Sequence, residues 1–82
     1  MGKVDLEKQY QDYLKRMELS EDRMHPAQRV ETRRAFMGGY GQSLAVMRDQ
    51  VGAMPDNEAI ECMEDMWSQI GKFWLKEAGR EK

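Results

Sequence analysis

A repeat of large side chains every seven residues runs through the middle of the chain and constrains the fold more than any other feature. Its principal positions are seven residues apart: Val30, Met37, Leu44 and Val51. The intermediate heptad positions hold one charged and three large side chains: Arg33, Tyr40, Met47 and Met54. A seam with this period predicts an α-helix that packs lengthwise against another helix, as in a coiled coil.

Three glycines, Gly38, Gly39 and Gly41, fall inside this repeat and leave two interpretations open. Each glycine in a helix interior costs about 1 kcal/mol relative to alanine, so a bend or a break into two helices is one interpretation. The repeat passes through the glycines without a slip in register, which favours one long helix over residues 26–52. In that helix, Gly38 and Gly41 let a neighbouring helix approach closely.

The two prolines of the chain divide it into three helical segments. Pro26 and Pro55 are read as helix starts, because a fixed φ and a missing N–H do no harm in a first turn. The apolar spacing ahead of Pro26 predicts a short amphipathic helix over residues 4–18. After Pro55, a second seam predicts a helix over residues 56–78; it consists of Ile60, Met63, Trp67, Ile70 and Trp74.

The link between the second and third segments is short, so the two long helices are expected to pack antiparallel as a hairpin. The predicted fold class is therefore all-α: a short N-terminal helix plus a long antiparallel helical hairpin, in one domain over residues 1–82. A chain of 82 residues buries only about 60–65% of its unfolded surface, which makes folding alone marginal. Self-association into a homo-oligomer is expected for this reason, and whether the first helix packs on its own hairpin or on a neighbour's stays open.

The predicted interface combines seam residues with two large apolar residues that fall off the seams, Phe36 and Leu75. Pairing the two arms around residues 54 and 55 sets Trp67 and Ile70 opposite the glycines of the long arm. The full set of expected interface residues is Phe36, Met37, Tyr40, Leu44, Met47, Trp67, Ile70, Trp74 and Leu75.

The net charge of −2, from 13 basic and 15 acidic residues, gives no reason to expect duplex nucleic acid or an anionic membrane as a partner. Basic residues nevertheless gather at the predicted open end of the hairpin: Arg29, Arg33, Arg34, Lys76 and Arg80. The three arginines lie near the positive end of the helix dipole, where cations are disfavoured. Either carboxylates such as Glu31 and Glu77, which is expected opposite Arg33, offset them, or they bind a small phosphate-bearing ligand.

Catalytic chemistry has few candidate residues. His25 is the only histidine and precedes a proline at a helix entrance, a position typical of a capping or surface residue. The single Cys62 lies among acids that disfavour its thiolate. A lone histidine and a lone cysteine cannot build a metal site. The sequence predicts neither an enzyme, nor a metal site, nor a cofactor.

The N-terminus has no apolar segment typical of a secretory signal, and no apolar run approaches the ~20 residues that cross a membrane. A cytoplasmic protein without membrane association is expected.

The whole chain resembles small helical accessory proteins of tailed bacteriophages. The resemblance is strongest in the segment Pro26-Ala27-Gln28-Arg29-Val30-Glu31-Thr32-Arg33-Arg34-Ala35-Phe36-Met37-Gly38-Gly39. Some of these assemble as oligomers of helical hairpins and sequester the cyclic nucleotide signals of host defence, and others bind and inhibit a host enzyme. The resemblance implies an anti-defence protein in the host-cell cytoplasm. It carries no binding residues over to this chain.

The sequence thus predicts a non-catalytic binding protein that acts by sequestration or inhibition. One hypothesis gives it a basic site for a small phosphate-bearing ligand such as a nucleotide signal. The alternative is a protein–protein interaction module that binds a host protein through its apolar helical seams.

Overall fold

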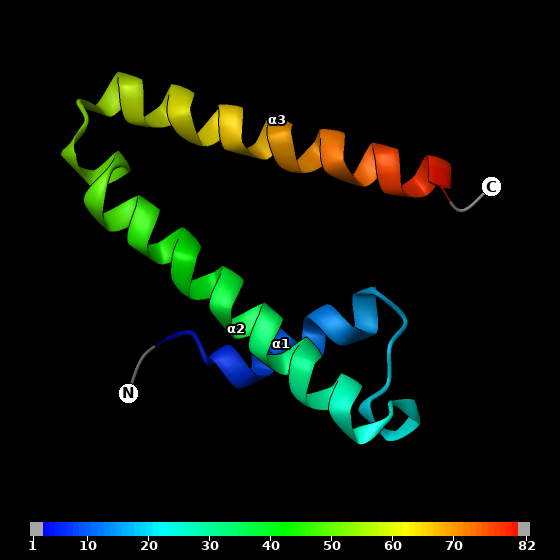
Figure 1. Ribbon diagram of the computed structural model, residues 1–82. Helices are drawn as coiled ribbons and strands as arrows, with labels where there is room; N and C mark the ends of the chain where they lie inside the picture. The colour runs from blue at the N-terminus through cyan, green and yellow to red at the C-terminus, as the bar shows by residue number, and fades with distance from the viewer. Residues whose placement is uncertain (1–2, 81–82) are drawn as a thin grey trace. The chain divides into compact units, whose positions relative to one another are not determined.

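The computed structural model describes residues 3–80 and consists of helices joined by short turns (Figure 1). In chain order the elements are α1 (Leu6–Arg16), the 3₁₀ turn η1 (Glu21–Arg23), α2 (Pro26–Asp49), the 3₁₀ turn η2 (Val51–Ala53) and α3 (Asp56–Arg80). The described residues contain no strand. The all-α class with three helices, predicted from the sequence, is confirmed.

Side-chain and backbone caps define both ends of α1. At its start, the Asp5 carboxylate accepts a hydrogen bond of 3.0 Å from the backbone N–H of Glu7. At its end, Glu18 adopts a left-handed conformation with φ 57°, and the backbone N–H of Leu19 donates to the carbonyl of Leu14 at 2.8 Å. This pattern is a Schellman-type stop, which reverses the chain direction after α1.

The second helix begins where the sequence predicts and passes through its glycines without interruption. His25 caps it, because its Nδ1 accepts a hydrogen bond of 3.2 Å from the backbone N–H of Ala27. The capping role expected for this histidine is therefore confirmed. The helix ends at Asp49, three residues before the predicted end, because the chain tightens there into η2.

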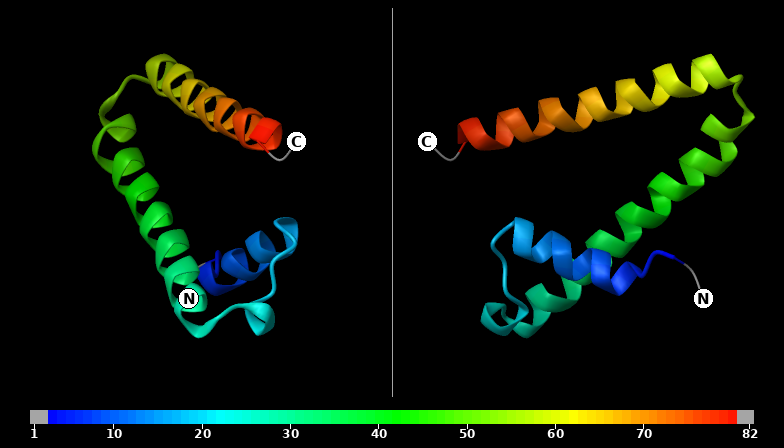
Figure 2. Two further views of the ribbon diagram at one scale, coloured as in Figure 1. Left: turned by 45° about the vertical axis from the view of Figure 1, so that its right-hand side comes forward. Right: turned by 180° about the vertical axis from the view of Figure 1, so that it is seen from behind.

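The chain divides into two compact units within α2, between Gln42 and Ser43. In the first unit, α1 lies across the first half of α2, as the different views show (Figures 1 and 2). The first helix therefore packs on the second helix of the same chain.

The core of the first unit forms around the buried side chains Tyr10, Leu14 and Met24. Phe36 joins this core to α2, since its ring lies 5.2 Å from the rings of both Tyr10 and Tyr13. The sequence predicts Phe36 as a contact either to the first helix or to another subunit, and the structure shows the contact to the first helix.

The glycines of α2 line an open surface within the first unit. A Cβ built on Gly38, Gly39 or Gly41 meets no other heavy atom within 4 Å in the described part of the chain. The close helix approach expected at Gly38 and Gly41 is therefore not formed by the residues of this unit.

The second unit, from Ser43 onward, contains the end of α2, η2 and α3. Val51 in η2 is its buried residue, with 5% of its surface exposed. None of the described residues of α3 is buried, although this helix is 25 residues long.

We predict that Tyr10→Ala lowers the free energy of unfolding by about 3 kcal/mol, because it removes a fully buried ring and leaves a cavity. Leu75→Ala is the control, since Leu75 is 76% exposed and its truncation leaves no cavity. Urea unfolding followed by far-UV circular dichroism measures both variants. Equal effects of the two substitutions contradict the predicted role of Tyr10.

Gly41→Ala is predicted to stabilise the protein by about 0.5–1 kcal/mol, because alanine favours the helix and its Cβ enters open space. Gly52→Ala is the control, since a Cβ there lies 3.2 Å from the carbonyl oxygen of Met47. Thermal melting compares the two. A fall in Tm for Gly41→Ala means instead that another helix packs closely on this face.

Candidate functional site

The five basic residues predicted to bind a ligand are divided between the two units. Arg29, Arg33 and Arg34 lie on α2 in the first unit, and Lys76 and Arg80 lie on α3 in the second.

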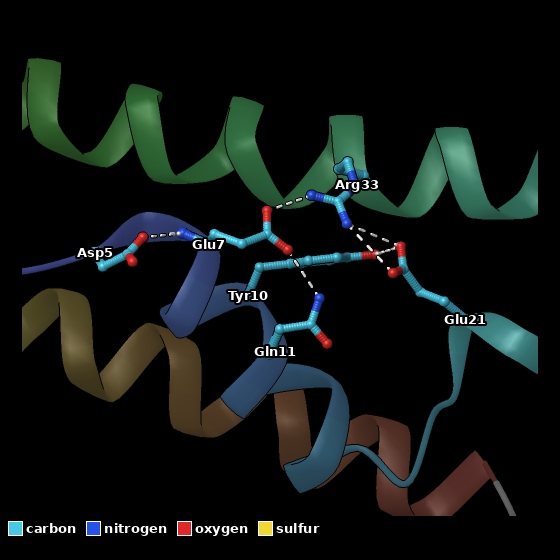
Figure 3. A network of polar contacts seen from close by, with 6 residues as sticks. All are labelled: Asp5, Glu7, Tyr10, Gln11, Glu21 and Arg33. Carbon is cyan, nitrogen blue, oxygen red and sulfur yellow. Dashed lines mark hydrogen bonds and ion pairs between the residues drawn. The ribbon is translucent and has the colours of Figure 1, made fainter.

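Arg33 stands at the centre of a polar network that joins α2 to α1 and η1 (Figure 3). Its Nη1 donates to the Glu7 carboxylate, and its Nη2 donates to both Glu21 carboxylate oxygens at 3.2 and 3.3 Å. The guanidinium carbon also lies 4.7 Å from the centre of the Tyr10 ring, a cation–π geometry. The Tyr10 hydroxyl donates to Glu21 at 3.4 Å, which closes the network.

The pKa shifts in this network follow from its hydrogen bonds and burial. The hydrogen bond from Arg33, followed by that from Gln11, lowers the pKa of Glu7 below its ordinary value. The hydrogen bond to Glu7 likewise raises the pKa of Arg33. Burial, followed by the negative charge of Glu21, raises the pKa of Tyr10. At neutral pH Arg33 is therefore a charged residue whose donors already face two carboxylates.

Two more of the five cations have a carboxylate partner on their own helix. Arg34 lies 3.8 Å from Glu31, one of the carboxylates that the sequence suggests as partners of the arginines. Arg80 pairs with Glu77 at 3.2 Å, so Glu77 has a partner on its own helix. Both arginines are largely exposed, so these pairs contribute little to stability.

The remaining two cations, Arg29 and Lys76, make no ion pair among the described residues. Lys76 lines a shallow hollow of about 330 Å³ on α3 together with Gln69, Lys72 and Phe73. Three of the five predicted basic residues, Arg33, Arg34 and Arg80, thus have a carboxylate partner within their own unit.

The predicted interface residues of the first unit are mostly used inside it. Phe36 and Met37 pack against the core, and the ring of Tyr40 lies 5.7 Å from that of Phe36. An open groove of about 460 Å³ remains beside these rings, lined by Tyr13, Thr32, Ala35, Phe36, Gly39 and Tyr40.

The predicted interface residues of the second unit, in contrast, stay exposed, except for Met47, which is half-buried. An open, mostly apolar groove of about 390 Å³ lies between the end of α2 and the first half of α3; it is lined by Ser43, Met47, Met63, Met66, Trp67 and Ile70. Leu44 on α2 is about half-exposed. Beyond the groove, Phe73 and Trp74 continue along α3, with their rings 5.0 Å apart in an edge-to-face arrangement.

The apolar stripe of α3 is the main candidate for a functional surface. We define it by the apolar residues that share one side of the helix: Ile60, Met63, Met66, Trp67, Ile70, Phe73 and Trp74. Trp67, at its centre, is 73% exposed. Leu75 is even more exposed but lies about 100° around the helix from Trp74, outside the stripe.

Sequence reasoning missed the partners of Arg33, which are Glu7, Tyr10 and Glu21. The signal for them was Arg33 itself, because a charged residue on an apolar seam needs nearby carboxylates. The identity of these partners could not be predicted from the sequence, because it depends on how α1 crosses α2.

Within the described residues 3–80, no group of three or more histidine, cysteine, aspartate or glutamate side chains is placed to hold a metal ion. No described helix combines the length and apolarity needed to cross a membrane.

Comparison of the chain with protein-family models, with curated proteins and with solved structures finds no match.

The stabilisation from the Arg33–Glu7 pair is predicted to disappear in acid. Because the folded-state pKa of Glu7 is lowered from about 4.5, the pair stabilises the fold above that pH and is lost as pH falls through the lower folded value. Glu7→Gln should therefore lower Tm at pH 7 and have progressively less effect below pH ~4.5.

Glu64→Gln on α3 is the matched control, since Glu64 makes no ion pair among the described residues. Thermal melts from pH 3 to 7 compare both variants with the unmodified chain. A Glu7→Gln effect that does not change with pH contradicts the assigned ion pair.

Proposed function

We propose that this protein is a non-catalytic binding protein that recognises a polypeptide through the apolar stripe of α3. The observation that carries the proposal is that stripe, which presents apolar side chains, two of them tryptophans, to solvent along most of a 25-residue helix. Tryptophan is enriched among residues that dominate the energy of protein interfaces. A helix with such a stripe binds another helix or a groove of matching shape.

The size of the stripe supports this function. Monomeric proteins seldom expose a contiguous apolar patch of more than a few hundred Å². With roughly 200 Å² for a whole aromatic side chain, the exposed parts of the stripe amount to something on the order of 600 Å². This approaches the about 800 Å² that each partner contributes to a standard protein interface.

The methionines of the groove add to this support. Met47, Met63 and Met66 line it, and flexible thioether side chains adapt to partners of different shape. A partner bound to the stripe also covers the groove between the end of α2 and α3. The hairpin and the oligomer that the sequence predicts are therefore part of this proposal.

Sequestration or inhibition is the mode of action that fits a binding surface without catalytic groups, in keeping with the resemblance to bacteriophage accessory proteins. The hypothesis of a basic site for a phosphate-bearing ligand has less support. Arg33, its central residue, already directs its donors to Glu7 and Glu21, and an incoming anion has to displace these carboxylates.

Site-specific photo-crosslinking tests the proposed function. Trp67 is replaced by the photoreactive p-benzoylphenylalanine, and the protein is irradiated in a bacterial lysate. The expected result is a discrete polypeptide adduct, identified by mass spectrometry as another protein or another copy of this chain. The same replacement at Leu75, which is equally exposed but lies outside the stripe, is expected to give much less adduct.

Absence of any adduct specific to position 67 overturns the proposed function. Far-UV circular dichroism confirms that both modified proteins keep their helices, which is expected because neither side chain is buried.

A further inference from the structure

The first part of α3 contributes to an apolar groove, and the later part presents two aromatic side chains whose apolar rings suit such a groove. Met63, Met66, Trp67 and Ile70 line the groove, and Phe73 and Trp74 follow on the same side of the helix. Trp74 lies 11 residues beyond Met63, about 16 Å along the axis of a straight helix. It therefore cannot fill the start of the groove to which its own helix contributes.

We propose that the stripe of α3 binds the α3 of a second copy of this chain, in antiparallel orientation, so that Phe73 and Trp74 of each copy fill the groove of the other. This inference rests on the proposed function, because it names the partner of the same surface. The symmetry is a two-fold axis, which makes one self-complementary surface sufficient for both copies.

Charge decides the orientation. Between residues 56 and 68, α3 carries five acidic residues and no basic one: Asp56, Glu58, Glu61, Glu64 and Asp65. Between residues 69 and 80 it carries three basic residues and one acidic one: Lys72, Lys76, Arg80 and Glu77. A parallel pair sets acidic half against acidic half, whereas an antiparallel pair sets each acidic half beside a basic half. The helix dipoles also oppose each other in the antiparallel pair.

The apolar register agrees with the charges. With the two-fold axis between Ser68 and Gln69, Trp67 of one copy lies level with Ile70 of the other. In the same register, Met63 lies level with Trp74 of the second copy, at the end of the groove that its own helix cannot fill. Heptad positions a and d alternate across such a seam, as antiparallel helix packing requires.

The area is sufficient for a stable pair. The exposed stripe, on the order of 600 Å² per copy, together with the side chains of α2 that line the groove, reaches the range of specific interfaces.

The first experiment measures mass in solution. Sedimentation equilibrium of the purified full chain is expected to give twice the 9.6 kDa of one chain. Trp74→Asp is expected to raise the dissociation constant by about tenfold or more. Leu75→Asp is the matched control: it changes the adjacent and more exposed apolar residue, outside the stripe, and is expected to leave the dimer intact.

The second experiment measures orientation through the single native cysteine. Spin labels on Cys62 are expected to lie about 20 Å apart along the axis of an antiparallel dimer, from 13 residues of helical rise. Labels on Gln69→Cys, in a Cys62→Ser background, are expected at about the 10 Å that separates packed helices. Equal separations at the two positions indicate a parallel dimer and overturn the proposal.

Two further results overturn the proposed pairing of two copies. One is a protein that stays monomeric at all concentrations, and the other is a dimer that Trp74→Asp leaves intact. The proposed function fails differently. A monomeric protein that crosslinks to another protein through position 67 retains the proposed function and loses only the second copy as its partner.

Discussion

The ring of Phe36 holds the first unit together, because it is the side chain of α2 against which the rings of α1 pack. Tyr10 and Tyr13 both lie 5.2 Å from it, and Leu14 and Met24 complete the buried cluster. A small chain has few such clusters, so the placement of α1 depends on this one. Once α1 lies across α2, Glu7 and Glu21 come within reach of Arg33, and the polar network forms around the covered face of Tyr10.

This packing also determines which predicted functional residues remain available. Phe36 and Met37 already pack within the chain, and Arg33 is paired with two carboxylates. The second unit shows no comparable cluster over its described residues 43–80, and its longest helix keeps Trp67 and Ile70 exposed. Covering the exposed apolar side chains of α3 with a partner polypeptide would therefore be favourable. This contrast between the two units is why a protein-binding function has more support than a ligand site at Arg33.

Local features of the structure could be predicted well from the sequence. Pro26 and Pro55 mark helix starts because the restriction on proline acts within one turn. The uninterrupted α2 follows from a heptad register that continues across Gly39. The end of α2 was less well predicted, because the heptad pattern continues through Val51 to Met54 and does not mark the change from α2 to η2.

By itself, the sequence determined the helical class, the number of helices and the apolar stripe of α3, because side-chain periodicity and helix capping are local properties. It also determined the separation of acidic and basic residues along α3, which needs no fold to be read. Only the tertiary structure decided that Arg33 pairs with Glu7 and Glu21. That choice depends on how α1 crosses α2, and ring packing around Phe36 sets this crossing between residues more than 20 positions apart in the sequence.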